Sequence, residues 1–242
     1  MKTALVTGSS RGIGRAIAIR LAEDGYKVII HCAGNAQKAE ETKQIIEQNG
    51  GIAVVEIADL CKVDETKALA ERIGKVDVLV LNASLQYDTY LESITPEDML
   101  AHYTCNAVSS FVLIQYFIDA MKEQKWGRIV TIGSVNEKKP IPRLMAYSMS
   151  KAAQTNMALS LALQVAQYGV TVNNVAPGVI YTDRNVEALS DADYAKKVAD
   201  SIPVGFYGEP NDCAGIVSLL CSEEGRYITG QNIFVDGGKS VQ

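Results

Sequence analysis

The chain has 242 residues, of which 48% are hydrophobic and 21% charged, and its formal net charge at pH 7 is −5. This length and composition predict one compact α/β domain over residues 1–242. They exclude a mainly disordered chain, because so apolar a sequence buries enough surface to offset its lost conformational entropy. The 23 lysines and arginines are outnumbered by 28 acidic residues and form no extended basic run, which excludes nucleic acid as a partner.

Histidine, cysteine and the first residues of the chain narrow the class further. His31 and His102 are the two histidines, and neither has a partner at metal-ligand spacing, so we expect no metal site. The five cysteines form no CxxC pair and indicate buried thiols in a reducing compartment. The uncharged stretch Met99–Ile118 contains too many polar groups to cross a membrane. Met1 and Lys2 lead directly into an apolar strand without a signal peptide, so we expect a cytoplasmic protein.

Short apolar runs rich in β-branched residues alternate with helix-length segments along the whole chain. Strands that are apolar on both faces are typical of a parallel sheet covered by helices on both sides. We therefore predict a Rossmann-type doubly wound seven-stranded parallel sheet. The predicted strands are Ala4–Thr7, Val28–Cys32, Ile52–Ile57, Val76–Leu81, Arg128–Ile132, Thr171–Val175 and Asn232–Val235.

Capping patterns and uncharged faces add detail to the predicted helices. Thr95-Pro96-Glu97-Asp98 and Ser190-Asp191-Ala192-Asp193 each place a cap three residues before an acid, which predicts helix starts at Thr95 and Ser190. The helical segments Ser109–Phe117 and Gln154–Val165 lack the charged outer face of a surface helix. Either a second copy of the chain covers them, giving a homodimer or homotetramer, or other parts of the same chain do.

The first strand ends in Thr7-Gly8-Ser9-Ser10-Arg11-Gly12-Ile13-Gly14, which leads into a helical pattern. Glycines let the backbone approach a pyrophosphate, and a helix start presents free N–H groups to it. The Gly-Lys-Ser/Thr run of an ATP or GTP phosphate loop is absent, so a dinucleotide site is favoured over that site and over a plain glycine turn.

The end of the second strand bears on the choice of dinucleotide. NAD-binding chains place an acid there for the adenine-ribose hydroxyl, but this chain has none between His31 and Asn35. Arg11 and Asn35 supply a cation and a donor for a 2′-phosphate. NADP(H) is therefore predicted over NAD(H), which stays the alternative.

A Tyr-x-x-x-Lys pair, Tyr147 and Lys151, opens the long helix after the fifth strand. Such a pair occurs by chance about once in a chain of this composition, so its position carries the argument. Ser134 lies at the end of that strand, where ligands bind in doubly wound sheets.

With these residues in place, the chain resembles the short-chain dehydrogenase/reductase family, and within it the β-ketoacyl carrier-protein reductases. The resemblance extends over nearly all residues from Lys2 to Gly238. Beyond the glycine loop it rests on Asp59, Asn82-Ala83, Asn106, Ser134, Tyr147 to Lys151, Asn174 to Gly178, Thr182, Tyr227 to Gly230 and Asp236 to Gly238.

The resemblance implies an oxidoreductase that reduces a carbonyl, in a 3-oxoacyl thioester or small ketone, to an alcohol. Tyr147 would exchange the proton, and Lys151 would lower its pKa and hold the nicotinamide ribose. Ser134 would orient the carbonyl, and Asn106 would anchor a water that leads to Lys151. The implied cofactor-binding residues are Gly8, Ser10, Arg11, Gly12, Ile13, Gly14, Asn35, Asp59, Leu60, Asn82, Ala83, Ser84, Tyr147, Lys151, Pro177, Gly178, Ile180 and Thr182. A substrate lid would span residues 181–206.

Some positions depart from the family pattern. Ser84 replaces a usual glycine beside the cofactor, as in pteridine reductases. Lys125 and Tyr168 stand where carrier-protein reductases have arginines, which makes an acyl carrier protein a doubtful partner and a free small molecule the expected substrate. Arg143, Tyr181 and Arg184 favour an anionic or polar ketone. The alternatives are a pteridine or sugar-alcohol reductase or dehydrogenase, and a non-catalytic dinucleotide-binding regulatory protein.

Overall fold

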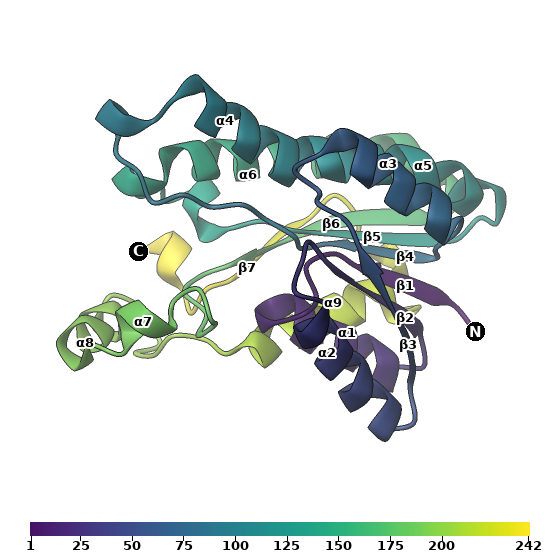
Figure 1. Cartoon of the computed structure of the whole chain (residues 1–242), viewed down its shortest axis with the longest axis horizontal. Helices are drawn as coiled ribbons and strands as arrows, with labels where there is room; N and C mark the ends of the chain where they lie inside the picture. Colours follow the sequence, from purple (N-terminus) through teal and green to yellow (C-terminus); the bar gives the residue numbers. More distant parts are fainter.

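The computed structural model describes residues 1–242 and contains one seven-stranded sheet. All neighbouring strands pair in parallel, in the order β3-β2-β1-β4-β5-β6-β7 (Figure 1). The strands are β1 (Thr3–Val6), β2 (Lys27–Cys32), β3 (Ile52–Ile57), β4 (Val78–Leu81), β5 (Gly127–Ile132), β6 (Val170–Pro177) and β7 (Asn232–Val235). The predicted doubly wound sheet is confirmed, with strand ends shifted by two residues at most.

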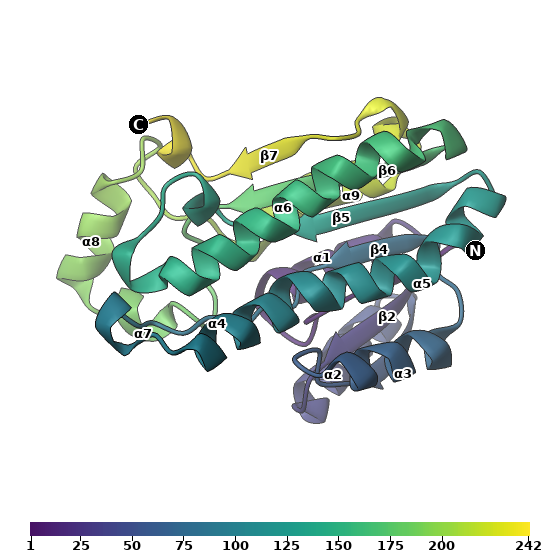
Figure 2. The ribbon, with the colours of Figure 1, turned by 90° about the horizontal axis from the view of Figure 1, so that it is seen from above.

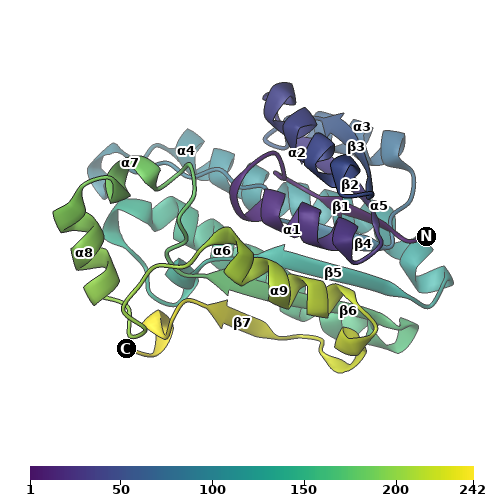
Figure 3. The same ribbon diagram turned by 90° about the horizontal axis from the view of Figure 1, so that it is seen from below.

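Helices cover both faces of this sheet. Figure 2 shows α3, α5 and α6 on one face, and Figure 3 shows α1, α2 and α9 on the other. Short helices α7 and α8 lie beyond the ends of β6 and β7 (Figure 1). The helices are α1 (Gly12–Glu23), α2 (Ala36–Gln48), α3 (Val63–Ile73), α4 (Pro96–Tyr103), α5 (Ser109–Glu123), α6 (Met145–Val165), α7 (Val186–Leu189), α8 (Ala192–Asp200) and α9 (Pro210–Cys221).

The strands are apolar throughout because each central strand contributes to two cores. Val78 and Val80 of β4 belong to the core under α1 and α9, whereas Leu79 and Leu81 belong to the core under α5 and α6. Successive side chains of a strand point to opposite faces, so both sets must be hydrophobic. The edge strands β3 and β7 are only partly buried, since each has one neighbouring strand.

One of the two predicted helix caps is confirmed and the other is shifted. Thr95 accepts a hydrogen bond from the Asp98 N–H, and the Asp98 carboxylate accepts one from the Thr95 N–H, which completes a capping box on α4. The prediction of Ser190 as a cap was wrong. Ser190 ends α7, and Asp191 caps α8 by accepting hydrogen bonds from two N–H groups of its first turn.

The uncharged stretch Met99–Ile118 forms the end of α4, a π-helical turn at Thr104–Val108 and most of α5. No helix anywhere in the chain combines the length and the apolar character needed to cross a bilayer. The rest of the chain does not cover the outer side of α5 and α6. Phe111 is 47% exposed and Leu163 is 86% exposed, which rules out cover by the same chain.

All five cysteines are free thiols. Four are buried, as predicted, but Cys61 is half-exposed. It lies in the loop between β3 and α3, and β3 is an edge strand, so less of the fold is available to cover that loop.

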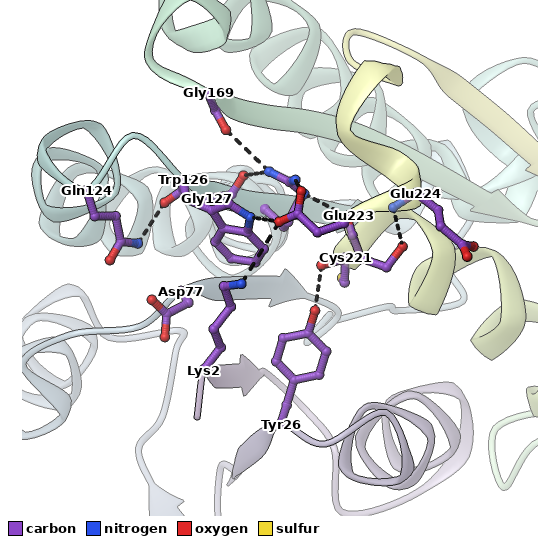
Figure 4. Close-up of polar contacts among 12 residues, drawn as sticks. Lys2, Tyr26, Asp77, Gln124, Trp126, Gly127, Gly169, Cys221, Glu223 and Glu224 are labelled. Atoms are coloured by element: carbon purple, nitrogen blue, oxygen red, sulfur yellow. Dashed lines mark hydrogen bonds and ion pairs between the residues drawn. The ribbon is translucent and has the colours of Figure 1, made fainter.

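A polar cluster closes the amino ends of the central strands (Figure 4). Arg128, 2% exposed, stacks on Trp126 with its guanidinium carbon 4.4 Å from the ring centroid, and it pairs with Glu223 at 3.8 Å. Its guanidinium also donates to backbone carbonyls of Ser222, Gly127 and Gly169. Lys2 Nζ also lies over the Trp126 ring, 4.0 Å from its centroid. This cluster ties α9 to the sheet at the edge opposite the predicted site.

Candidate active site

The glycine loop between β1 and α1 has the backbone that its sequence predicts. Gly8 and Gly12 adopt positive φ angles of +64° and +57°, which a residue with a side chain rarely adopts. A Cβ on Gly14 would lie 2.4 Å from the Gly8 carbonyl oxygen. The N-terminus of α1 has no side-chain cap and no acid in its first turn. Its free N–H groups and the close backbone approach therefore fit an anionic pyrophosphate.

Asn82 and Thr7 fix this loop against the end of β4. The Asn82 amide donates to the carbonyl oxygens of Thr7 and Gly8 at 2.9 and 3.0 Å. The Thr7 hydroxyl oxygen accepts hydrogen bonds from the N–H groups of Asn82 and Ala83. Asn82, predicted as a cofactor residue, thus also holds the glycine loop in position.

The two histidines hold loops on either side of the site, a function that sequence reasoning missed. The Gly8 N–H donates to Nδ1 of His31 at 3.1 Å, so Nε2 carries the proton and donates to the Ala58 carbonyl. Burial lowers the pKa of His31 to about 4, which keeps this ring neutral. His102 likewise accepts from the Tyr87 N–H at 3.0 Å. In the sequence, the apolar residues that flank His31 and His102 were the only indication that these two rings are buried and structural.

Arg11 lies beside a second cation that the sequence reasoning did not single out. Asp183, in the segment after β6, accepts from Lys38 Nζ at 2.7 Å and lies 3.6 Å from Arg11 Nη1. The hydrogen bond from Lys38 lowers the pKa of Asp183. Asn35, predicted as a donor to the cofactor, caps α2, because its side-chain Oδ1 accepts a hydrogen bond from the Lys38 N–H. The signal for Lys38 was its place in the first turn of the helix after β2.

The loop after β3 places Asp59 and Leu60 beside the carboxyl ends of β2 and β3. The Asp59 carboxylate accepts from the Cys61 N–H at 3.0 Å, and Leu60 is buried. These contacts fix the local conformation of the loop where an adenine contact was predicted.

Tyr147 and Lys151 lie together in the first turns of α6. Both side chains are buried, at 6% and 1% exposure, and Lys151 Nζ is 5.9 Å from the Tyr147 ring centroid. The ammonium group donates to the Ile132 carbonyl at 2.7 Å and to Gln154 Oε1 at 3.0 Å. These bonds fix it at the carboxyl end of β5.

The electrostatics of this pair differ from the expectation. Burial, assisted by the charge of Arg184, lowers the pKa of Lys151 to about 7. Burial raises the pKa of Tyr147, while the charge of Arg184 and a side-chain hydrogen bond with Ser134 lower it. The groups that lower this pKa are Arg184 and Ser134, and the predicted lowering by Lys151 stays a prediction. Because burial raises its pKa, the phenol stays protonated at neutral pH.

Ser134 and Asn106 flank the pair. Ser134 follows β5 in extended conformation, and its hydroxyl oxygen also accepts from the Asn136 N–H at 3.2 Å. Asn106 sits in the π-helical turn and bonds the backbone N–H and carbonyl of Leu85 as well as the Ser150 hydroxyl. Asn106 has no direct contact with Lys151 among these bonds, so the predicted water link stays a prediction.

The segment after β6 lies against the glycine loop. A Cβ on Gly12 would lie 3.4 Å from the Thr182 methyl, which places these two residues side by side. At Gly178 a Cβ would lie 2.8 Å from the Asp236 Cα, so the turn after Pro177 needs glycine. Ile180 is buried and pairs with Gly208. The predicted lid, residues 181–206, contains α7 and α8, and its motion stays a prediction.

The sequence-family model for short chain dehydrogenases matches residues 2–193 of this chain. This chain belongs to the short-chain dehydrogenase family. Among its relatives, the 3-oxoacyl-(acyl-carrier-protein) reductase FabG of Staphylococcus aureus is 37% identical over 241 residues, covering 98% of this chain and 97% of that protein. Glucose 1-dehydrogenase 2 of Bacillus subtilis is 35% identical over 246 residues, covering 99% and 95%.

Among solved structures, the 3-oxoacyl (acyl-carrier-protein) reductase of Agrobacterium tumefaciens, determined with NADP bound, superimposes with a TM-score of 0.94 at 37% identity. The match covers 98% of this chain and 93% of that chain. The chain is therefore an oxidoreductase of this family, and the family binds NAD or NADP.

The lowered pKa of Lys151 gives a stability prediction for Lys151→Met. Between pH 7 and the ordinary lysine pKa near ~10.4, the unfolded chain holds a proton on Lys151 that the folded chain has lost, so folding is favoured as pH rises. The wild type should gain about 1.4 kcal/mol of unfolding free energy per pH unit relative to the variant. Urea unfolding at pH 7, 8 and 9 measures this, and a difference independent of pH would contradict the lowered pKa.

Proposed function

We propose that this chain is an NADP(H)-dependent carbonyl reductase that converts a ketone or a 3-oxoacyl thioester into the corresponding alcohol. The observation that supports it most is the buried Tyr147 beside Lys151 and Ser134, at the strand edge that also presents the glycine loop. A regulatory protein that only senses a dinucleotide needs the glycine loop but no buried phenol and ammonium pair. The enzyme is therefore favoured over that alternative.

Each residue of the group has a distinct task in this proposal. Ser134 donates a hydrogen bond to the carbonyl oxygen and stabilises the negative charge that develops on it. Tyr147 then gives its proton to that oxygen, which suits a phenol that is protonated at neutral pH. Lys151 supports the phenolate that remains, and Asn106 anchors a water that returns the proton. A bound nicotinamide dinucleotide supplies the hydride for the carbonyl carbon.

The glycine loop and the loops after β3, β4 and β6 hold the dinucleotide in this proposal. The whole chain serves as one catalytic domain, with residues 181–206 as the lid over the substrate. The binding residues are those of the sequence prediction together with Lys38: Gly8, Ser10, Arg11, Gly12, Ile13, Gly14, Asn35, Lys38, Asp59, Leu60, Asn82, Ala83, Ser84, Tyr147, Lys151, Pro177, Gly178, Ile180 and Thr182.

Tyr147→Phe tests the proton transfer. The variant should keep NADPH affinity within about twofold and lose on the order of 10³-fold or more in kcat, because it removes one hydroxyl that is needed only in the transition state. NADPH binding is followed by fluorescence titration and turnover by absorbance at the NADPH band. Turnover like that of the wild type would refute the role.

The relatives support two substrate classes. The Staphylococcus aureus relative is named as a 3-oxoacyl reductase, and the Bacillus subtilis relative as a glucose dehydrogenase. Lys125 and Tyr168 offer one cation where carrier-protein reductases have two arginines, which weakens docking of an acidic carrier protein. A free small carbonyl compound is therefore the favoured substrate, and a sugar or sugar alcohol is the second candidate.

The preference for NADP(H) rests on the cation pair Arg11 and Lys38. Arg11 lies in the glycine loop after β1 and Lys38 in the first turn of α2, and both contact Asp183. The end of β2 carries no acid to bind a ribose hydroxyl. Their shared partner is Asp183, an exposed carboxylate of the segment after β6. In this proposal the 2′-phosphate replaces Asp183 as the partner of both cations.

The double variant Arg11→Ala/Lys38→Ala should raise the KM for NADPH about 10- to 100-fold and leave the KM for NADH nearly unchanged, since only NADPH carries the phosphate. Lys43→Ala on the same helix α2 is the matched control, because its ammonium pairs with Glu40 and Glu47. A wild-type enzyme that prefers NADH would refute the assignment.

We further propose that a second copy of the chain covers the outer face of α5 and α6, giving a homodimer or homotetramer. Phe111, Tyr116 and Leu163 leave a large apolar surface on these neighbouring helices. Covering such a surface is favourable by roughly 25 cal/mol per Å².

Phe111→Glu should therefore shift the mass in solution toward the monomer, because the buried face of a dimer would then hold an unpaired charge. Multi-angle light scattering measures the mass. Leu91→Glu, at an exposed position outside this face, is the control and should leave the mass unchanged. A wild-type protein that is monomeric at all concentrations would refute the proposal.

A further inference from the structure

Arg184 connects two loops at the carboxyl edge of the sheet. Its Nη2 donates to the backbone carbonyl and to the hydroxyl of Ser84, both at 3.2 Å, and its Nη1 donates to Gln86 Oε1 at 3.2 Å. Ser84 and Gln86 follow β4, whereas Arg184 follows β6. Its guanidinium therefore lies near Tyr147, whose pKa the charge of Arg184 lowers.

The charge of Arg184 has no counterion in the chain. No carboxylate oxygen lies within 4.0 Å of its guanidinium, and all three of its acceptors are neutral. The neighbouring Asp183 is held by Lys38 and Arg11. Asp88, in the loop after β4, is held by Arg143 at 2.5 Å.

Glu137, the remaining acidic residue near the site, also has other partners than Arg184. Glu137 is largely buried, and it accepts hydrogen bonds from Thr155, Asn174 and Asn232. Burial raises its pKa, so it is a poor source of negative charge for Arg184. Neither Lys151 nor Arg184 is therefore paired with a carboxylate in the site.

We propose that Arg184 binds a carboxylate of the substrate, so that this enzyme reduces oxo acids in preference to neutral ketones and esters. The inference rests on the proposed carbonyl reductase and specifies its substrate. A guanidinium presents two parallel N–H groups that match a carboxylate, and such charged hydrogen bonds are about twice as strong as those to neutral acceptors. A carboxylate would therefore displace the Ser84 and Gln86 acceptors.

Ser84 has a definite task in this arrangement. The family pattern has glycine at this position, which offers a carbonyl but no hydroxyl. The Ser84 hydroxyl adds a third neutral acceptor for the guanidinium. These acceptors hold Arg184 over the site before substrate arrives, which reduces the entropy lost when the substrate carboxylate binds.

The test compares oxo acids with their methyl esters, each with NADPH. The pairs are pyruvate and methyl pyruvate, acetoacetate and methyl acetoacetate, and levulinate and methyl levulinate, which move the carboxylate stepwise away from the ketone. The wild type should reduce at least one acid with a kcat/KM about 10-fold or more above that of its ester, because only the acid forms the charged pair.

Arg184→Gln should lower kcat/KM for that acid by about 10- to 100-fold and change it for the ester by less than about 3-fold, with an unchanged KM for NADPH. Arg184→Lys should restore part of the loss, since it keeps the charge but not the paired donors. Arg143→Gln is the matched control, because Asp88 already neutralises that guanidinium. It should leave the ratio between acid and ester unchanged.

The outcomes separate this inference from the proposed function. If esters are reduced as well as acids and depend on Tyr147, the carbonyl reductase stands and the role of Arg184 is refuted. An equal loss for acid and ester in Arg184→Gln, or a weaker binding of NADPH, would assign Arg184 to the fold or to the cofactor and would also refute it. If the wild type reduces none of these pairs, the preference for oxo acids is overturned, whereas the carbonyl reductase is judged separately on thioesters, sugars and the Tyr147→Phe variant.

Discussion

The site depends on the burial of one ammonium group. Lys151 is 1% exposed, and its cation has no carboxylate partner to repay the loss of hydration. A carbonyl and an amide oxygen are its only polar contacts, so the pKa of Lys151 falls to about 7. The fold holds this costly group in place because β5 and α6 are anchored independently by the two apolar cores. The packing of the sheet therefore compensates for the cost of burying Lys151 beside Tyr147.

Around that pair, neutral polar side chains position the loops. Asn82, Asn106, His31 and His102 each bond to backbone groups of a loop that contributes to the site. Buried amide and imidazole groups that satisfy loop backbone cost little, since every donor finds an acceptor. Such bonds are directional and therefore fix loop geometry more sharply than apolar contacts do. Two of these residues were predicted to contact cofactor or water, and their bonds to the backbone give them a structural task as well.

The distribution of charge explains how one edge of the sheet could distinguish two anionic groups. Arg11 and Lys38 share a carboxylate from the segment after β6, at the side where α2 begins. Arg184, the next residue after that carboxylate, extends toward Tyr147 with neutral acceptors only. Adjacent residues of one segment thus face the two ends of the site.

The sequence by itself determined the fold class, the glycine loop and the Tyr147 and Lys151 pair, because these depend on local periodicity and on fixed spacings along the chain. Strand hydrophobicity on both faces predicts a covered parallel sheet wherever the strands are placed. The sequence could not determine contacts between residues that are far apart in the chain, such as Lys38 with Asp183 or His31 with Gly8. The sequence alone gave no reason to expect different surroundings for Arg143 and Arg184. Only the tertiary structure separated them, by giving one guanidinium a carboxylate and leaving the other without one.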